Sequence, residues 1–131
     1  EQMMLPNPEN IMKSYPFQLS GGMRQRVGIA MAMTFNPKLL IADEPTSALD
    51  VTTQSQIIRN MLERREKFNT GIIMVTHNLA VAAYISDKII VMKDGKIVEQ
   101  GSRDDILNYP KHDYTKSLLE AVPGWEDELY A

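Results

Sequence analysis

The apolar run Leu39-Leu40-Ile41-Ala42 constrains the fold of this chain more than any other stretch. It follows Lys38 and stops abruptly at Asp43-Glu44-Pro45, so the pattern predicts a strand over residues 38–42. A strand that is apolar on both faces is typical of a parallel sheet covered by helices on both sides. A second run of this kind, residues 71–76, ends in His77. We therefore expect an α/β fold with parallel strands and flanking helices.

Helices and a hairpin are expected between and after these strands. Asn36-Pro37 ends the first long helical segment. Asp94-Gly95 is a strong turn signal and predicts a hairpin that pairs residues 87–93 with residues 96–100. Tyr15 to Gln18 is expected to be extended, because a residue before proline avoids the helical region. The expected helices cover residues 10–13, 21–35, 52–68, 79–85, 103–108 and 114–121.

Size and composition narrow the class of protein. A chain of 131 residues, 44% hydrophobic and 24% charged, is long enough for one core, so residues 1–131 are expected to form a single domain. The net charge of -3 gives no electrostatic reason to expect nucleic-acid binding. No apolar run approaches the length of a membrane span, and the lack of cysteine excludes disulfides and thiolate metal sites. The stretch Glu1 to Pro6 resembles no signal peptide, and we expect a fragment of a longer protein.

Two adjacent carboxylates, Asp43 and Glu44, stand where the first predicted strand ends. In parallel sheets, ligands bind beyond the carboxyl ends of the strands. This placement suits a magnesium–nucleotide site, in which one carboxylate holds Mg²⁺ through its water shell and the other acts on an attacking water. Alternatively, the pair caps a strand and solvates a loop, which is the better interpretation of such a run taken alone.

A Ser-Gly-Gly turn precedes the first long helix. Ser20 is a good N-cap type, since its hydroxyl can accept a hydrogen bond from an early helical N–H. Gly21 and Gly22 carry no side chain, so a ligand can approach the N–H donors closely. Those donors and the helix dipole attract anions, phosphate above all. An ordinary capped helix explains this stretch equally well when it is taken alone.

Four stretches of the chain resemble, in order, the motifs of one family, the ATP-binding cassette (ABC) ATPases. Residues 19–26, Leu-Ser-Gly-Gly-Met-Arg-Gln-Arg, resemble the signature motif, and residues 39–44 resemble the Walker B motif. Ser47-Ala48-Leu49-Asp50 resembles the D-loop, and Thr76-His77 resembles the switch histidine. The resemblance covers about residues 15–123. It implies a partial cassette with a signature helix at 20–35, a Walker B strand at 38–44 and a C-terminal extension at about 101–131.

The resemblance implies a role for each matching residue. Asp43 would support Mg²⁺ through water, and Glu44 would be the general base that polarises the hydrolytic water. His77 would contact the γ-phosphate of ATP and hold that water together with Glu44. Asp50 would bridge subunits, although a helix N-cap is an alternative role and the two are compatible. The signature residues expected to bind the γ-phosphate of an ATP held mainly by another subunit are Ser20, Gly21, Gly22 and Gln25.

The chain also departs from the family pattern. Met23 stands where a glutamine is common, and Asn78 replaces an aspartate but can still cap a helix. No Gly-x-x-x-x-Gly-Lys-Ser/Thr phosphate loop occurs anywhere, and the upstream glutamine loop and adenine-stacking aromatic residue are missing too. The chain therefore resembles the C-terminal portion of an ABC ATPase. We expect it to be inactive in isolation, with weak affinity for ATP or none.

The far end, Tyr109 to Pro123, resembles the segment after the cassette in oligopeptide, dipeptide and nickel importers, with Asp113 in place of a usual proline. His112 and Asp113 are too few to indicate a metal site. The expected parent is an ATPase subunit at the cytoplasmic face of a bacterial membrane. Its expected partners are a second ATPase subunit, identical or different, transmembrane permease subunits and, indirectly, a substrate-binding protein. The alternatives are a non-transport ABC ATPase, such as a repair or translation factor, and a non-catalytic interaction fragment.

Overall fold

A computed structural model describes residues 7–47 and 49–121. The chain divides into two compact units, one ending at Val75 and the other beginning at Thr76. Each unit is described by itself. Within the described residues, no helix is both long enough and apolar enough to cross a membrane.

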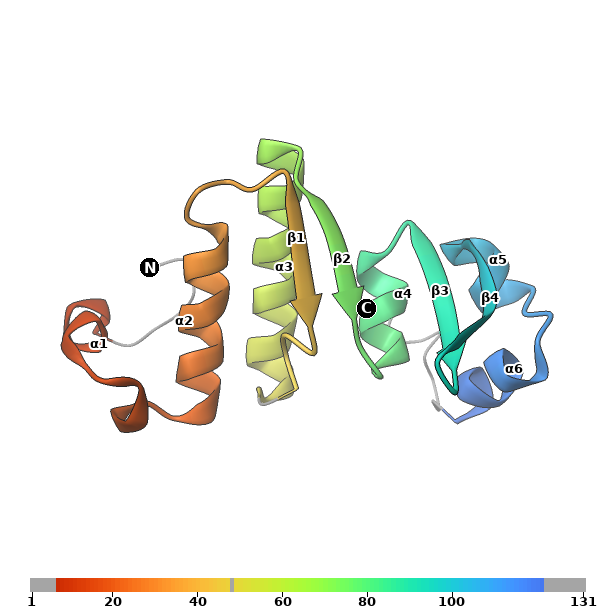
Figure 1. The fold of residues 1–131 in the computed structure, drawn as a ribbon, viewed down its shortest axis with the longest axis horizontal. Helices are drawn as coiled ribbons and strands as arrows, with labels where there is room; N and C mark the ends of the chain where they lie inside the picture. The colour runs from red at the N-terminus through yellow and green to blue at the C-terminus, as the bar shows by residue number, and fades with distance from the viewer. Residues whose placement is uncertain (1–6, 48, 122–131) are drawn as a thin grey trace. The chain divides into compact units, whose positions relative to one another are not determined.

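The first unit contains a two-stranded parallel sheet with a helical crossover (Figure 1). Strands β1 (Leu39–Asp43) and β2 (Gly71–Val75) pair in register, from Leu39 opposite Gly71 to Asp43 opposite Val75. The predicted parallel strands are therefore confirmed. The helices of this unit are α1 (Pro8–Lys13), the 3₁₀ helix η1 (Pro16–Gln18), α2 (Gly21–Met33) and α3 (Val51–Phe68).

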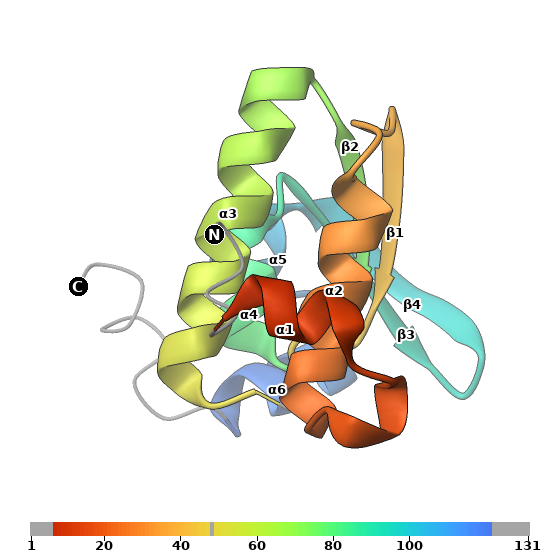
Figure 2. The same cartoon turned by 90° about the vertical axis from the view of Figure 1, so that its left-hand side faces the viewer.

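Helix α3 contributes three buried residues to the core of the first unit. Its buried residues Ile57, Ile58 and Met61 follow the i, i+1, i+4 spacing of one helix face. Burying each side chain of this size contributes roughly 1.5–3 kcal/mol. Asn69, at a φ of 51°, ends the helix in the left-handed conformation that asparagine tolerates. Figures 1 and 2 show α3 along one face of the two strands.

The sheet is buried on one face only, so the expectation that its strands are covered on both faces is wrong for the described residues. Leu40 and Ala42 are each 8% exposed, whereas their neighbours Leu39 and Ile41 are 52% and 68% exposed. Alternate residues of a strand point to opposite faces, and α3 covers only one of them. Ile73 and Val75 of β2 are also exposed.

The expected extended conformation of Tyr15 to Gln18 is only partly correct. Tyr15 is extended, with φ −77° and ψ 152°, but Pro16–Gln18 forms a 3₁₀ turn. Proline suits the first position of a helical turn, since its φ is already fixed near the required value. The Gln18 side chain also accepts a hydrogen bond from the Tyr15 N–H at 2.7 Å, which closes the turn.

The second unit contains the predicted hairpin. Asp94 and Gly95 connect its strands with φ values of 49° and 73°, as a tight two-residue hairpin turn requires. The core comprises Ala83, Ile89, Val91, Ile106, Leu107 and Leu119. The elements are α4 (Leu79–Ile85), β3 (Lys88–Lys93), β4 (Lys96–Ser102), α5 (Arg103–Asn108) and α6 (Asp113–Glu120).

Candidate functional site

The Ser20 turn begins α2 as predicted. The backbone N–H of Met23 donates to the Ser20 hydroxyl at 3.2 Å, so Ser20 is the N-cap of the helix. A Cβ added to Gly21 would meet no atom within 4 Å, which leaves the start of the helix open to an approaching group. The exposed Arg24 stabilises the turn, because its guanidinium donates to the carbonyl of Leu19 at 2.8 Å. The geometry suits an anion at this helix start.

Asp43 and Glu44 occupy the carboxyl end of β1. Asp43 is exposed and Glu44 is half-buried. Glu44 has a φ of 45°, a left-handed conformation that costs a non-glycine residue roughly 1–2 kcal/mol. Its N–H donates to the carbonyl of Val75 on the neighbouring strand at 2.9 Å. Glu44 is therefore fixed just beyond the last paired residue of the parallel sheet.

The carbonyl of Glu44 accepts hydrogen bonds from two directions. The side-chain amide of Gln25, on α2, donates to it at 2.9 Å. The backbone N–H and the hydroxyl of Ser47 donate to it at 3.3 Å and 3.1 Å. This arrangement joins the signature helix to the end of β1 within one unit. Sequence reasoning assigned Gln25 to the nucleotide and missed this contact. The spacing of motifs along the sequence does not indicate how close α2 and β1 lie in the fold.

Asp50 is the N-cap of α3, which confirms that structural interpretation. Its carboxylate accepts from the backbone N–H of Thr53 at 2.9 Å and from the Thr53 hydroxyl at 2.7 Å. These hydrogen bonds, the backbone one foremost, hold the pKa of Asp50 below its ordinary value. The bridging role between subunits stays a prediction. Ala48 of the predicted D-loop lies outside the described residues.

His77 is exposed and belongs to the second unit, whereas Asp43 and Glu44 belong to the first. Thr76 separates it from the end of β2, and it precedes α4, whose N-cap is Asn78. The Asn78 side chain accepts from the backbone N–H of Val81 at 3.2 Å, so the replacement of aspartate by asparagine retains the cap. The joint action of His77 and Glu44 stays a prediction.

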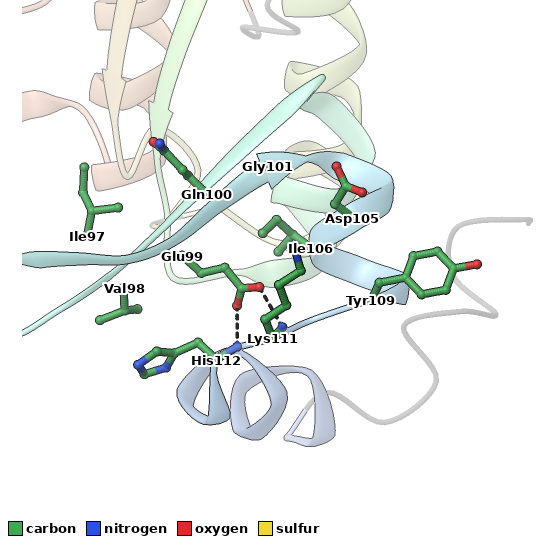
Figure 3. A pocket seen from close by; sticks show the side chains of 10 residues that line it. All are labelled: Ile97, Val98, Glu99, Gln100, Gly101, Asp105, Ile106, Tyr109, Lys111 and His112. Carbon is green, nitrogen blue, oxygen red and sulfur yellow. Dashed lines mark hydrogen bonds between the residues drawn. The ribbon is translucent and has the colours of Figure 1, made fainter.

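A groove of about 570 Å³ lies beside β4 and α5 in the second unit (Figure 3). Glu99 bridges it, because its carboxylate accepts from the backbone N–H groups of Lys111 and His112 at 2.7 Å and 3.1 Å. The nearby Thr115 hydroxyl and then the Lys111 N–H lower the pKa of Glu99, although the Thr115 oxygen lies outside hydrogen-bonding geometry. None of the predicted site residues lines this groove. Through these two hydrogen bonds, Glu99 of β4 holds the segment between α5 and α6 against the hairpin.

The residues present supply only part of a binding site for a magnesium–nucleotide complex. Magnesium is usually held by one or two carboxylates together with waters and substrate phosphates, and the exposed Asp43 can supply such a carboxylate. No group of three or more His, Asp or Glu side chains that could hold a metal by itself occurs in residues 7–47 and 49–121. The start of α2 suits a terminal phosphate. The sequence offers no phosphate loop for the rest of the nucleotide.

Known proteins resemble this chain in both sequence and fold. A family model described as ABC transporter matches residues 1–47. A solved ATP-binding cassette, a dimer in a post-hydrolysis state bound to ADP and Pi, superposes with a TM-score of 0.71 at 34% identity, over 78% of this chain and 43% of that chain. The chain belongs to the ABC transporter family of ATP-binding proteins.

Two similar proteins are ATP-binding proteins of peptide transport. The oligopeptide transport ATP-binding protein OppD of Lactococcus lactis subsp. cremoris is 50% identical over 99% of this chain. The dipeptide transport ATP-binding protein DppD of Escherichia coli is 52% identical over 97% of it. The chain spans 39% of the length of each of these two relatives.

Proposed function

We propose that these residues form the signature and Walker B part of the ATP-binding subunit of a peptide importer. The observation that carries this proposal is the position of Glu44, which is fixed beside Asp43 at the carboxyl end of a parallel strand. The capped start of α2 belongs to the same unit. The named peptide-transport relatives support transport rather than a repair or translation factor.

The hydrolytic side of the site would consist of Asp43, Glu44 and His77. Asp43 would hold Mg²⁺ through water, and the ion would supply charge neutralisation on the phosphates. Glu44 would take a proton from the attacking water, a contribution typically worth about 10²–10⁴ in rate. His77 would hold this water and contact the γ-phosphate. The imidazole and the carboxylate are chemically suited to these tasks.

The signature side would act on a nucleotide bound by a second ATPase subunit. Ser20, Gly21 and Gly22 would present the start of α2 to its γ-phosphate, and Asp50 would lie at the contact between subunits. The dimeric state of the solved ATP-binding cassette supports this arrangement. Closure of two such subunits on ATP would drive transmembrane permease subunits at the cytoplasmic face of the membrane. A substrate-binding protein would deliver the peptide.

Peptide uptake by a chimaera tests the proposal. In it, these 131 residues replace the matching segment of the Lactococcus lactis relative, and the relative supplies the remainder of the full-length polypeptide. We expect the chimaera to restore oligopeptide uptake in cells that lack the relative, and Glu44→Gln to abolish it. A chimaera that hydrolyses ATP but supports no peptide uptake would contradict the proposed solute class.

The second candidate is that the chain in isolation is a non-catalytic interaction module. The missing phosphate loop favours this for the 131 residues alone, because the lysine and backbone cradle of that loop bind the β- and γ-phosphates. Calorimetric titration of the chain with Mg-ATP should detect no binding at micromolar concentrations. Micromolar affinity would exclude this candidate.

A further inference from the structure

The geometry assigns Gln25 a positioning role: we infer that its amide holds the backbone of Glu44 and thereby fixes the carboxylate at the end of β1. This inference rests on the proposed function, in which Glu44 is the general base. It replaces the expectation that Gln25 binds the nucleotide. It also makes the signature helix a support for the hydrolytic residue of its own chain.

The contact is well placed for this role. The Gln25 amide nitrogen lies 2.9 Å from the Glu44 carbonyl oxygen, and the hydrogen bond is partly buried. Both backbone groups of Glu44 are then engaged, since its N–H donates to Val75. Ser47 donates to the same carbonyl but belongs to the loop that follows. Of these donors to the carbonyl, Gln25 is the one on a long helix.

Glu44 needs such support because its conformation is unfavourable. Its φ of 45° is rare for a residue with a side chain. Glu44 also precedes Pro45, and a residue before proline is further restricted by contact with the proline ring. A strained residue keeps its conformation only where its surroundings over-determine it. Loss of the amide would let the Glu44 backbone relax and displace its carboxylate.

The two roles of Gln25 predict different kinetics. Displacement of a general base slows the chemical step and lowers kcat, whereas loss of a nucleotide contact raises the KM for ATP. A misplacement of about 1 Å at a reacting group can cost on the order of 10²-fold in rate. A positioning role therefore predicts that kcat falls by about 10- to 100-fold while KM changes by less than about twofold.

The test uses the purified full-length chimaera. Gln25→Met removes the donor and keeps an unbranched side chain, and Gln25→Lys restores a donor that can reach the carbonyl. Gln56→Met, at an exposed position of α3, controls for the exchange of glutamine for methionine in a helix. ATPase kinetics and the unfolding temperature are measured for each variant, with Glu44→Gln alongside.

We expect Gln25→Met to lower kcat with little change in KM or in unfolding temperature, and Gln25→Lys to recover most of the loss. A kcat within twofold of the parent, or a raised KM at unchanged kcat, would overturn the inference. If Gln25→Met does not fold, the Gln25→Lys variant provides the test. A near-parental kcat of Gln25→Lys would support the positioning role of Gln25, and a folded Gln25→Lys variant with a low kcat would overturn it. Unchanged activity in Glu44→Gln would instead overturn the proposed function.

Discussion

Ser20 is a helix cap in the structure and a phosphate ligand in the proposed function, and one substitution separates the two roles. Ser20→Asp keeps a carboxylate oxygen that can accept from Met23, and a negative charge suits the start of a helix. The same charge would repel a phosphate. We therefore expect Ser20→Asp to retain the stability of the chimaera and to abolish its ATPase activity, measured by denaturant unfolding and phosphate release.

Ser20→Ala is the matched control for this experiment. It removes the cap without adding charge and should lower the free energy of unfolding by about 1 kcal/mol. A chimaera carrying Ser20→Asp that is as active as the parent would contradict the phosphate role and leave the cap as the sole function of this residue.

Glu99 makes the stability of the second unit depend on pH. Its pKa is lowered from the ordinary value of 4.5, so the unfolded chain takes up a proton at a higher pH than the folded chain does. The contribution of Glu99 is complete above pH 4.5 and is lost as the pH falls through the lowered pKa. We expect Glu99→Gln to reduce the acid-induced fall in unfolding temperature, measured by calorimetry between neutral pH and pH 3.

Other carboxylates also contribute to acid sensitivity, since hydrogen bonds with Thr53 and Ser102 lower the pKa of Asp50 and of Asp105 respectively. Wild type and variant must therefore be compared at each pH. Glu120→Gln, at an exposed position of α6, is the matched control. An acid profile of Glu99→Gln identical to that of wild type would refute a stabilising role for the Glu99 carboxylate.

Single residues show which site features the sequence could predict. The caps at Ser20, Asp50 and Asn78 follow from residue type alone, because a short polar side chain before a helix satisfies an N–H locally. The bond from Gln25 to Glu44 could not be predicted. It depends on the tertiary approach of α2 to β1 and on a φ that glutamate ordinarily avoids.

At the scale of elements, local chemistry predicted most boundaries well. The hairpin follows from Asp94-Gly95, since both residues must adopt positive φ. The strand expected at residues 38–42 is β1, Leu39–Asp43, and the helix expected at 52–68 is α3, Val51–Phe68. The exposed face of the sheet does not follow from the apolar run itself. An apolar run in the sequence does not indicate whether helices cover one face of the strand or both.

That open face should drive self-association of the isolated chain. Ile41 and Ile73 are paired across the strands and are 68% and 52% exposed on the same face. Exposed apolar patches of this kind commonly mark contacts or aggregation. We expect the 131-residue chain to form dimers or larger species by light scattering, and the double variant Ile41→Thr, Ile73→Thr to be more nearly monomeric.

Ile90→Thr is the matched control for this change. Ile90 is 58% exposed on β3, in the second unit, and its replacement should leave the association unchanged. A parent chain that remains a clean monomer at high concentration would show that the exposed face of the sheet does not associate.

At the scale of the whole molecule, the proposed site is distributed over two units. Asp43 and Glu44 are in the first and His77 is in the second. The resemblance to the family's motifs, which occur here in the family's order, predicted these residues as one set. The family and the fold class are confirmed by the relatives. The assembly of the residues into one catalytic site stays a prediction.

ATP hydrolysis by the purified chimaera tests the central claim most directly. The claim is that Glu44 is the general base of an ATPase site, and Glu66→Gln, at an exposed position of α3, is the matched control. The proposal predicts that Glu44→Gln lowers kcat by about 10²–10⁴-fold while Mg-ATP still binds, and that Glu66→Gln has parental activity. A Glu44→Gln variant that hydrolyses ATP at the parental rate would contradict it.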